Sequence, residues 1–547
     1  MVIKVHCMKK LLVSILCAAT LFSCRKLDQP ITRDYNEGAY WRNEEDLQAA
    51  LTSCYENMSN DGYFFGDEAL SDNAYVNGDG FDQVTRISSG AYDPSNNRVQ
   101  GEWGYRFTCI RKCNTVVLNA DKVPGIDSVR KHRILAEARF IRAYSYFQLV
   151  NWYGDVPFYT NLITIDEAKT ISRTDKVSIL NFIQQELTAI RADLPVNNYS
   201  GAANGYAEKD KGRITRGAAI ALSARVHMFK SEWQAAIDDC ELLINKSDNG
   251  SYGLQSSYSN IFTVANEYNN EVILDFQYGG GRTFSTQRTF LPQTVALLRS
   301  TLVPTQDLVD DYIMLNGKGI SEPGSGYDEN NPYQNRDPRF EATILHDGST
   351  ITDFEGKVQT ILTKPGSVPA TNSVEDQGAS PTGYYFYKYY DRTATNYNSG
   401  LNLIALRYAD VLLMYAEAKN ELTQLDAGVW DMTIRALRAR AKFTDEAALG
   451  FPGSSQETLR TIIRRERRAE LAFEGIRAFD IRRWKIADQV MNKPVRGIKV
   501  TSGGFNTDPN GYIIAENRQF TNPKHYLWPV PTFERDQNTN LGQNQDW

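Results

Sequence analysis

Residues 133–157 read RILAEARFIRAYSYFQLVNWYGDVP, and this stretch decides the fold class. Residues 133–150 contain no Gly or Pro, and their apolar side chains fall around most of the surface of an α-helix. A helix that is apolar on most sides is buried among other elements. The stretch therefore predicts a long helix inside a helix-rich body, with these side chains in the core: Leu135, Phe140, Ile141, Tyr144, Phe147 and Val150.

Two further stretches carry the same periodicity. Residues 217–245 predict two short helices with a break at 230–232, and residues 406–422 predict a third. Small Ala side chains on these helices, such as Ala221, Ala224 and Ala416, permit close approach of neighbouring backbones. Hairpins of this kind resemble tetratricopeptide repeats, although the regular period of about 34 residues is absent. We therefore predict irregular, solenoid-like stacking of helices.

Helical patterns occupy residues 41–58, 102–246 and 404–485, while residues 59–101 and 248–400 are rich in Gly, Asn, Asp, Ser and Tyr. The latter stretches are too long for simple connections. We predict a mainly α protein: one irregular tetratricopeptide-like body with a large loop-rich face and a few short strands, among them residues 271–277 and 384–390. Loops on a rigid scaffold are where binding usually occurs.

The N-terminus has the form of a secretion signal. Lys9 and Lys10 precede an apolar stretch that is too short to span a bilayer. The sequence LFSC at 21–24 resembles a bacterial lipobox, so we expect residues 1–23 to be removed, Cys24 to carry lipid and residues 24–40 to form a linker. Met8 is a possible start, because the leader opens directly after it.

The charge balance disfavours nucleic acid as a partner. Without residues 1–23 the chain has 57 basic and 66 acidic side chains, a formal net charge of −9. No run of basic residues predicts membrane binding by charge, so attachment would depend on the lipid. The cysteines that follow Cys24 form no disulfide framework and are expected as buried thiols: Cys54, Cys109, Cys113 and Cys240.

Sequence signatures of common enzymes are absent. The chain contains no GxSxG, HExxH or GxxxxGK[ST] motif and only 5 His residues. The charged stretch 464–483 spaces its Arg, Glu and Asp mostly three or four residues apart, which predicts a ladder of ion pairs along a helix surface. We therefore expect no catalytic residues and no cofactor. We also expect no metal, because residues 67–82 lack the EF-hand pattern.

Aromatic and polar residues alternate in two loop-rich segments, 61–92 and 276–290. Aromatic rings can stack on sugar rings, and Asn, Asp and Arg can bind hydroxyl groups. For any single aromatic residue, packing of the loop onto the body is a competing interpretation. As candidate ligand-binding residues the sequence offers Asp72, Asn73, Tyr75, Phe81, Tyr278, Arg282 and Phe284, with Trp103 as a weaker candidate that would also open a framework helix.

Ordered motifs occur along the whole chain. They are YWRNEED at 40–46, EARFIRAY at 137–144 with GDVP at 154–157, GRIT at 212–215, DPRF at 337–340, LRYAD at 406–410 with AEA at 416–418, ERR at 466–468, EGIR at 474–477, DIRRW at 480–484, WPVP at 528–531 and QN at 543–544. In order and spacing they resemble those of the SusD/RagB family of Bacteroidetes surface lipoproteins. These are framework motifs, and they do not identify a ligand.

The resemblance implies one SusD-like domain over residues 41–547, anchored by lipid at the cell surface on the outer membrane. It implies non-catalytic binding of oligosaccharide or polysaccharide and delivery to a SusC-like TonB-dependent transporter. Alternatives remain open: the ligand is a peptide, the chain is a scaffold for its transporter alone, or it is a glycoside hydrolase with a pair of carboxylates on the loop face.

Overall fold

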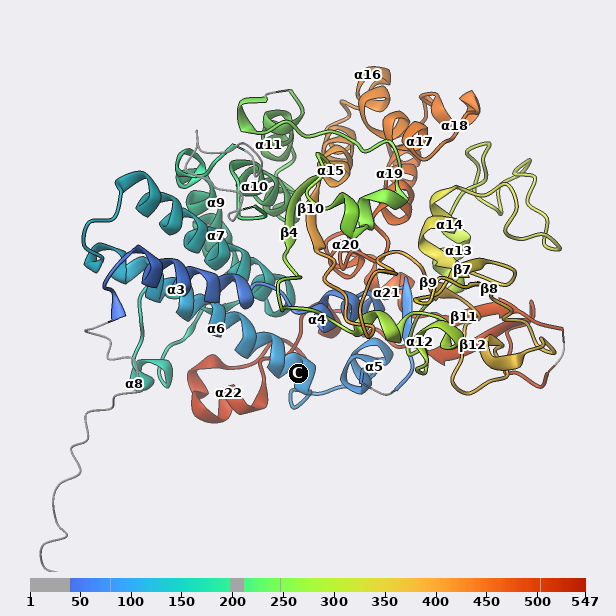
Figure 1. Ribbon diagram of the computed structural model, residues 1–547, viewed down its shortest axis with the longest axis horizontal. Coiled ribbons are helices and arrows are strands. Elements are labelled where there is room, and N and C mark those ends of the chain that lie inside the picture. Colours follow the sequence, from blue (N-terminus) through green and yellow to red (C-terminus); the bar gives the residue numbers. More distant parts are fainter. Residues whose placement is uncertain (1–39, 79, 197–210, 246, 502) are drawn as a thin grey trace, which may run out of the picture.

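The computed structural model describes residues 40–78, 80–196, 211–245, 247–501 and 503–547. One half of the molecule consists of packed helices, and the other half consists of long loops with short strands and helices (Figure 1). This arrangement confirms the predicted fold class. The predicted signal peptide and Cys24 lie outside the described residues, among which no helix is both long and apolar enough to cross a membrane.

The helical half is built from helices that pack on one another largely in chain order (Figure 1). Neighbours in this row contact each other, from α3 through α6, α7, α9, α10, α11 and α15 to α19. This is the predicted solenoid-like packing. The helices are α3 (Glu44–Glu56), α6 (Asn97–Asn119), α7 (Ser128–Tyr153), α9 (Lys176–Ala189), α10 (Arg216–Lys230), α11 (Trp233–Ile244), α15 (Tyr408–Glu421) and α19 (Gln456–Leu471).

Helix α7 contains the stretch that decides the fold. The Asp127 side chain caps its N-terminus by accepting from Arg130 N, and Gly154 ends it with a φ of 72°. Its residues from 140 to 153 are all buried, as the absence of a polar face predicts. The break between α10 and α11 falls at the predicted place, where Ser231 adopts a left-handed φ of 59°.

The predicted loop 59–101 differs from expectation, because much of it is helical. Asn60 caps α4 (Asp61–Gly66) by accepting from Tyr63 N, and α5 (Asp82–Ser89) ends at Gly90 with a φ of 82°. Helix α6 begins at Asn97, since the Asn96 side chain accepts from two of its first N–H groups. Helices this short depend on their caps and on tertiary packing, which periodicity does not detect.

A two-stranded antiparallel sheet of β4 (Val272–Phe276) and β10 (Leu403–Arg407) lies between the two halves (Figure 1). The strand predicted at 271–277 is thus confirmed. Of the strand predicted at 384–390, only residues 385–386 form a strand. The other pairs are β1 (Ala74–Val76) with β5 (Leu302–Pro304), β2 (Val156–Pro157) with β3 (Arg173–Thr174), β6 (Ile344–Leu345) with β9 (Tyr385–Phe386), β7 (Thr350–Thr352) with β8 (Val358–Thr360), and β11 (Pro494–Lys499) with β12 (Tyr512–Asn517).

Short helices complete the described chain, most of them in the loop-rich half and around α19. They are α8 (Ile165–Ala168), α12 (Gln293–Ala296), α13 (Gln306–Asp311), α14 (Arg339–Thr343), α16 (Ala427–Trp430), α17 (Ala436–Arg440), α18 (Glu446–Leu449), α20 (Arg477–Arg483), α21 (Ala487–Val490) and α22 (Thr532–Gln537). The cysteines at 54, 109, 113 and 240 are buried free thiols, as predicted.

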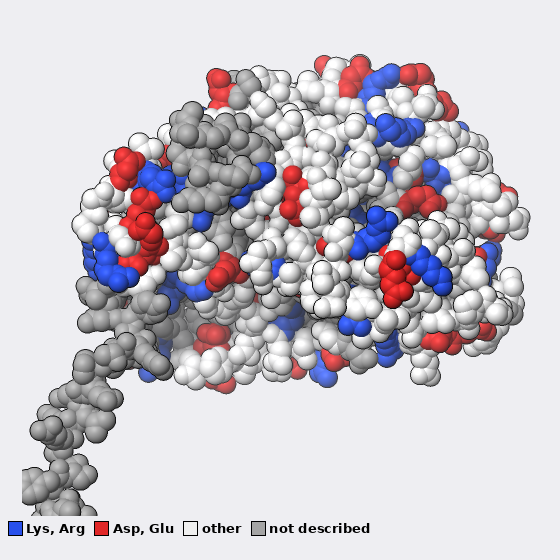
Figure 2. All heavy atoms as spheres, in the orientation of Figure 1, with Lys and Arg blue, Asp and Glu red and all other residues white. Residues whose placement is uncertain are grey.

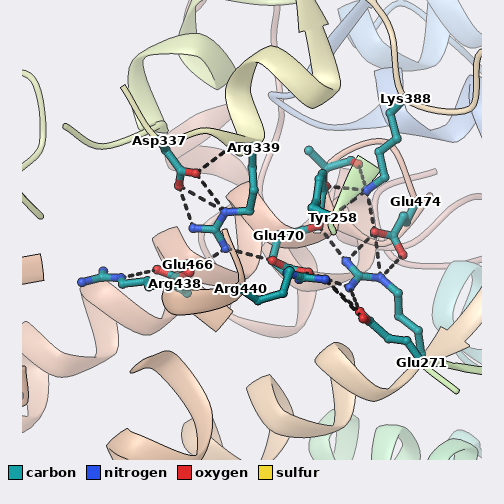
Figure 3. A network of polar contacts seen from close by, with 12 residues as sticks. Tyr258, Glu271, Asp337, Arg339, Lys388, Arg438, Arg440, Glu466, Glu470 and Glu474 are labelled. Carbon is teal, nitrogen blue, oxygen red and sulfur yellow. Dashed lines mark hydrogen bonds and ion pairs between the residues drawn. The ribbon is translucent and has the colours of Figure 1, made fainter. Parts of the chain in front are cut away.

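The charged stretch 464–483 forms ion pairs, but the predicted ladder along a helix surface is wrong. Asp480 and Arg483 are the only described pair within the stretch at such a spacing. Glu466, Glu470 and Glu474 are 0% to 5% exposed and join a network with residues distant in sequence (Figure 3). Arg407 Nη1 lies 2.6 Å from Glu470 Oε1 and 2.8 Å from Glu271 Oε1. The remaining members of the network are Asp337, Arg339, Lys388, Arg438 and Arg440. The stretch therefore joins the two halves of the molecule from within.

Asp275 on β4 provides a pH-dependent test of the fold. It is 6% exposed and accepts one hydrogen bond of 3.0 Å from Asn402, while its second oxygen has no partner among the described residues. Burial raises its pKa to about 7. The native protein therefore keeps a proton that the unfolded chain releases, so its stability falls between about pH 4 and pH 7. Asp275→Asn is expected to remove this loss and to add about 2 to 4 kcal/mol at pH 8 but almost nothing at pH 4.

Urea unfolding at both pH values measures this difference. Asp166→Asn is the control, because the Asp166 side chain is 98% exposed and should give no pH-dependent change. An equal effect of Asp275→Asn at pH 4 and pH 8 would contradict the burial argument.

Candidate functional site

The segment that follows β4 forms a tight turn that presents Tyr278 and Arg282. Gly279, Gly280 and Gly281 all have positive φ values, 93°, 57° and 104°, which only glycine adopts readily. Gly279 and Arg282 exchange two backbone hydrogen bonds of 2.6 and 2.9 Å. The turn places the Arg282 guanidinium 4.5 Å from the centroid of the Tyr278 ring. An aromatic ring and a planar cation thus form one unit at the end of the strand.

This unit contacts the start of α4. Arg282 Nη2 donates to Ser59 O at 3.0 Å, and Tyr278 Oη lies 3.5 Å from Asp61 Oδ1. Thr286 donates to the other oxygen of Asp61. Burial and the Asp61 carboxylate raise the pKa of Tyr278 to about 12, so its hydroxyl stays a donor at neutral pH. The two segments that the sequence singled out, 61–92 and 276–290, therefore meet at Asp61 and Tyr278.

A second group of aromatic residues lies on segments near this turn, and backbone hydrogen bonds connect one of those segments to the turn. Phe284 and Ser399 exchange hydrogen bonds of 3.0 and 2.8 Å, which places the segment 395–400 beside the turn. Arg288 lies 4.5 Å from the Tyr397 ring centroid. The Phe354 ring packs edge-on against the rings of Tyr390 and Tyr397, with centroids 5.2 and 5.0 Å apart.

We call these residues the aromatic face: Tyr278, Arg282, Arg288, Phe354, Tyr390 and Tyr397. Apart from the buried Tyr278, they are partly exposed. The sequence did not single out Phe354, Tyr390 or Tyr397, although they lie in the predicted loop-rich stretch. The density of Tyr in residues 384–397 was the available signal. Because they come from segments far apart in sequence, only the fold shows that they lie together.

The other candidate residues lie within the framework of this structure. The Asp72 carboxylate binds Arg477 at 2.8 Å and Arg468 at 3.0 Å, and Asn73 donates to Glu68 at 2.6 Å. Tyr75 packs beside β5, Phe81 against Gly66, Phe284 against Phe65 and Trp103 against Tyr153. These candidates are 1% to 9% exposed. Packing accounts for their positions, and a contact with ligand stays a prediction for each.

The surface carries no single dominant sign of charge on the face seen in Figure 2, where acidic and basic side chains are interspersed. Within the described ranges, no group of three or more His, Cys, Asp or Glu side chains could hold a metal ion. The aromatic face therefore offers rings, hydroxyl groups and guanidinium groups as its means of binding.

Comparison with known proteins gives consistent results over nearly the whole chain. The sequence model of the SusD family matches residues 270–547, and a second model, described as starch-binding associating with outer membrane, matches residues 28–228. SusD-like protein P25 of Formosa agariphila is 28% identical over 500 residues, covering 85% of this chain and 88% of that protein. The starch-binding protein SusD of Bacteroides thetaiotaomicron is 26% identical over 212 residues, covering 37% of this chain and 34% of that protein.

Among solved structures, a SusD-like carbohydrate-binding protein from Bacteroides fragilis superposes with a TM-score of 0.81 at 28% identity, covering 92% of this chain and 99% of that one. The match thus includes both the helical half and the loop-rich half. With one family model matching more than half of its residues, this chain belongs to the SusD family.

Proposed function

We propose that this chain is a non-catalytic protein that binds oligosaccharide or polysaccharide on the aromatic face. The observation that carries the proposal is the pairing of the Phe284 and Ser399 backbones, which brings the segment of Tyr278 and Arg282 beside the segment of Tyr397. Tyr397 in turn contacts Arg288 and Phe354, and Phe354 contacts Tyr390. Sugar rings present apolar C–H faces and polar hydroxyl edges, which rings and guanidinium groups complement. Relatives named for starch binding and carbohydrate binding support the same ligand class.

A glycoside hydrolase is the less favoured alternative. Such an enzyme needs an accessible carboxyl group with a raised pKa opposite a second carboxylate. Asp67 and Asp275 have pKa values raised by burial to about 6 and about 7, but they are 8% and 6% exposed. Asp67 is also ion-paired with Arg98 at 2.8 Å. These groups are therefore poorly placed to reach a substrate.

The proposal also includes a cellular location and a partner protein. Cys24 would carry the lipid that holds the chain on the outer membrane, and a SusC-like TonB-dependent transporter would receive the glycan. The description of the second family model, which names the outer membrane, supports this location. A peptide ligand, or a scaffolding role beside the transporter alone, is the competing proposal. Copurification of the full chain with a membrane transporter tests the partnership.

Glycan binding by the aromatic face is tested with residues 25–547. Tyr390→Ala is expected to weaken binding about tenfold, equivalent to about 1.4 kcal/mol, because it removes a stacking surface. Tyr278 is buried, so Tyr278→Ala should weaken binding indirectly, by releasing Arg282 from the Tyr278 ring. Native affinity electrophoresis against plant, fungal and host polysaccharides measures the retardation, with peptides as a separate set.

Phe533→Ala is the matched control, because Phe533 on α22 is 57% exposed and lies outside the aromatic face. Retardation that both Tyr variants retain would refute the choice of site while leaving glycan binding intact. Retardation by peptides alone would favour the peptide alternative, and turnover of a glycan would favour the hydrolase.

A further inference from the structure

A groove of about 750 Å³ lies apart from the aromatic face, where the end of α7, the start of α9, the turn between α10 and α11, the end of α20 and the C-terminal segment meet. Its volume falls within the range of about 300 to 1,000 Å³ typical of small-molecule sites. The cations that line it are Lys176, Lys230, Arg482, Arg483, Lys485 and Lys524, against the single carboxylate of Glu232. We call it the basic groove.

Two of these cations are neutralised by carboxylates. Lys230 Nζ lies 2.6 Å from Glu232, and Arg483 lies 2.6 Å from Glu417 and 2.8 Å from Asp480. The other four, Lys176, Arg482, Lys485 and Lys524, form no ion pair with any residue that the structure describes. The groove therefore has an excess of positive charge.

Arg482 is the most constrained of the four. It is 8% exposed, its Nη1 donates to Ala478 O at 2.9 Å and to Leu70 O at 3.3 Å, and its guanidinium lies 5.1 Å from the centroid of the Trp152 ring. Its Nε has no hydrogen-bond partner among the described residues. A buried cation without a counter-ion is unfavourable, so an anion in the groove would gain more there than at an exposed lysine. Burial, together with the positive charges of Lys524 and Arg482, lowers the pKa of His525 to about 4, consistent with a positive potential.

Two carboxylates next to the groove bond to groove residues, but neither forms an ion pair with a groove cation in the described chain. Asp155 accepts from the backbone N–H of Lys176 at 2.9 Å, and Asp488 accepts from the Tyr526 hydroxyl at 2.8 Å. The rings of Phe229 and Tyr526 form part of the wall. The whole chain has a formal net charge of −6, so a flat anionic membrane or nucleic acid would be repelled by most of the molecule. A concave basic site with ring walls fits a small anionic ligand.

We propose that the basic groove is a second binding site, which takes the carboxylate or sulfate group of an acidic oligosaccharide. The inference rests on the proposed function for the class of ligand, and it adds the requirement that the ligand carries an anionic group. The cations would hold the anionic group, while Tyr526 and Phe229 would contact the sugar ring.

The test compares three saccharides of equal length: an oligogalacturonate, a sulfated oligogalactoside and the neutral oligogalactoside. Calorimetric titration in 50 mM salt is run on the chain without its lipid. Lys176→Gln with Lys485→Gln is expected to lower affinity for an acidic ligand at least tenfold, because both cations line the groove and neither forms an ion pair with a described residue. Circular dichroism checks the fold of this variant, since Lys485 Nζ also lies 4.8 Å from the centroid of the Tyr526 ring. Lys357→Gln with Lys364→Gln removes the same charge from residues outside the groove and should change nothing. The carboxylate and sulfate arms identify which anion is bound.

Unchanged affinity for both acidic saccharides in the groove variant would overturn the inference, as would an equal loss in the control. Inorganic sulfate that binds as tightly as the sulfated saccharide would indicate an adventitious ion only. Groove-dependent binding to phosphatidylglycerol vesicles without saccharide binding would assign a lipid headgroup instead. If neutral saccharide still binds in a Tyr390-dependent way, only the groove inference fails; if no saccharide binds at all, the proposed function fails with it.

Discussion

Replacing Arg407 with Met is expected to lower the free energy of unfolding by about 3 to 5 kcal/mol, because it leaves buried carboxylates without their counter-ion. Arg407 is 1% exposed and contacts three glutamates: Glu271 at 2.8 Å, Glu470 at 2.6 Å and Glu474 at 2.7 Å. Arg440, Arg407 and Arg339 together hold the pKa of Glu470 well below its usual range, so removing Arg407 takes away one of the three cations that keep this carboxyl charged.

Urea unfolding followed by circular dichroism measures the loss. Arg435→Met is the matched control, because Arg435 pairs with Glu446 at 2.8 Å but the two side chains are 35% and 71% exposed. Exposed pairs of this kind contribute about 0 to 1 kcal/mol. A loss below about 1 kcal/mol for Arg407→Met would mean that water or rearrangement compensates the network.

For this network, the sequence indicated that the charged residues form ion pairs but not that they are buried. The spacing within residues 464–483 indicated ion pairs, since neighbours on a helix are fixed by its geometry. It could not indicate burial, because Glu470 pairs with Arg407 and Arg339, which lie 63 and 131 residues away. Helix α7 was predictable for the opposite reason: its apolar pattern is local and continuous over several turns.

In the candidate site, too, local features were predictable from the sequence, whereas contacts between distant residues were not. Tyr278 and Arg282 were found because the sequence places them beside three glycines, and their closeness is local. The hydrogen bond between Tyr278 and Asp61 spans 217 residues, and no periodic pattern predicts it. Asp72 and Trp103 were chosen for their residue types, and their burial results from contacts with Arg477 and Tyr153 in other elements. Residue type suggests chemistry, but only packing decides which groups remain available to a ligand.

Trp528→Ala is expected to cost about 3 to 5 kcal/mol of unfolding free energy, the range for removing a fully buried large aromatic side chain. Trp528 is 0% exposed and stacks on Trp152 with ring centroids 4.2 Å apart and planes at 13°. Its backbone N–H donates to Trp152 O at 2.7 Å, and Asn544 donates to Tyr153 O at 2.8 Å. The C-terminal segment therefore supplies partners for carbonyl groups that the end of α7 leaves unpaired.

Phe533→Ala again provides the control, since the same C-terminal segment carries Phe533 with 57% exposure, and it should change stability by less than about 0.5 kcal/mol. Lys524 and Tyr526 line the basic groove only a few residues before Trp528. If Trp528 holds this segment against α7, its loss should weaken acidic saccharide binding together with stability, even in the folded variant at low temperature. A stable Trp528→Ala variant with full affinity for acidic saccharide would contradict the role assigned to this stack and show that the groove is shaped without it.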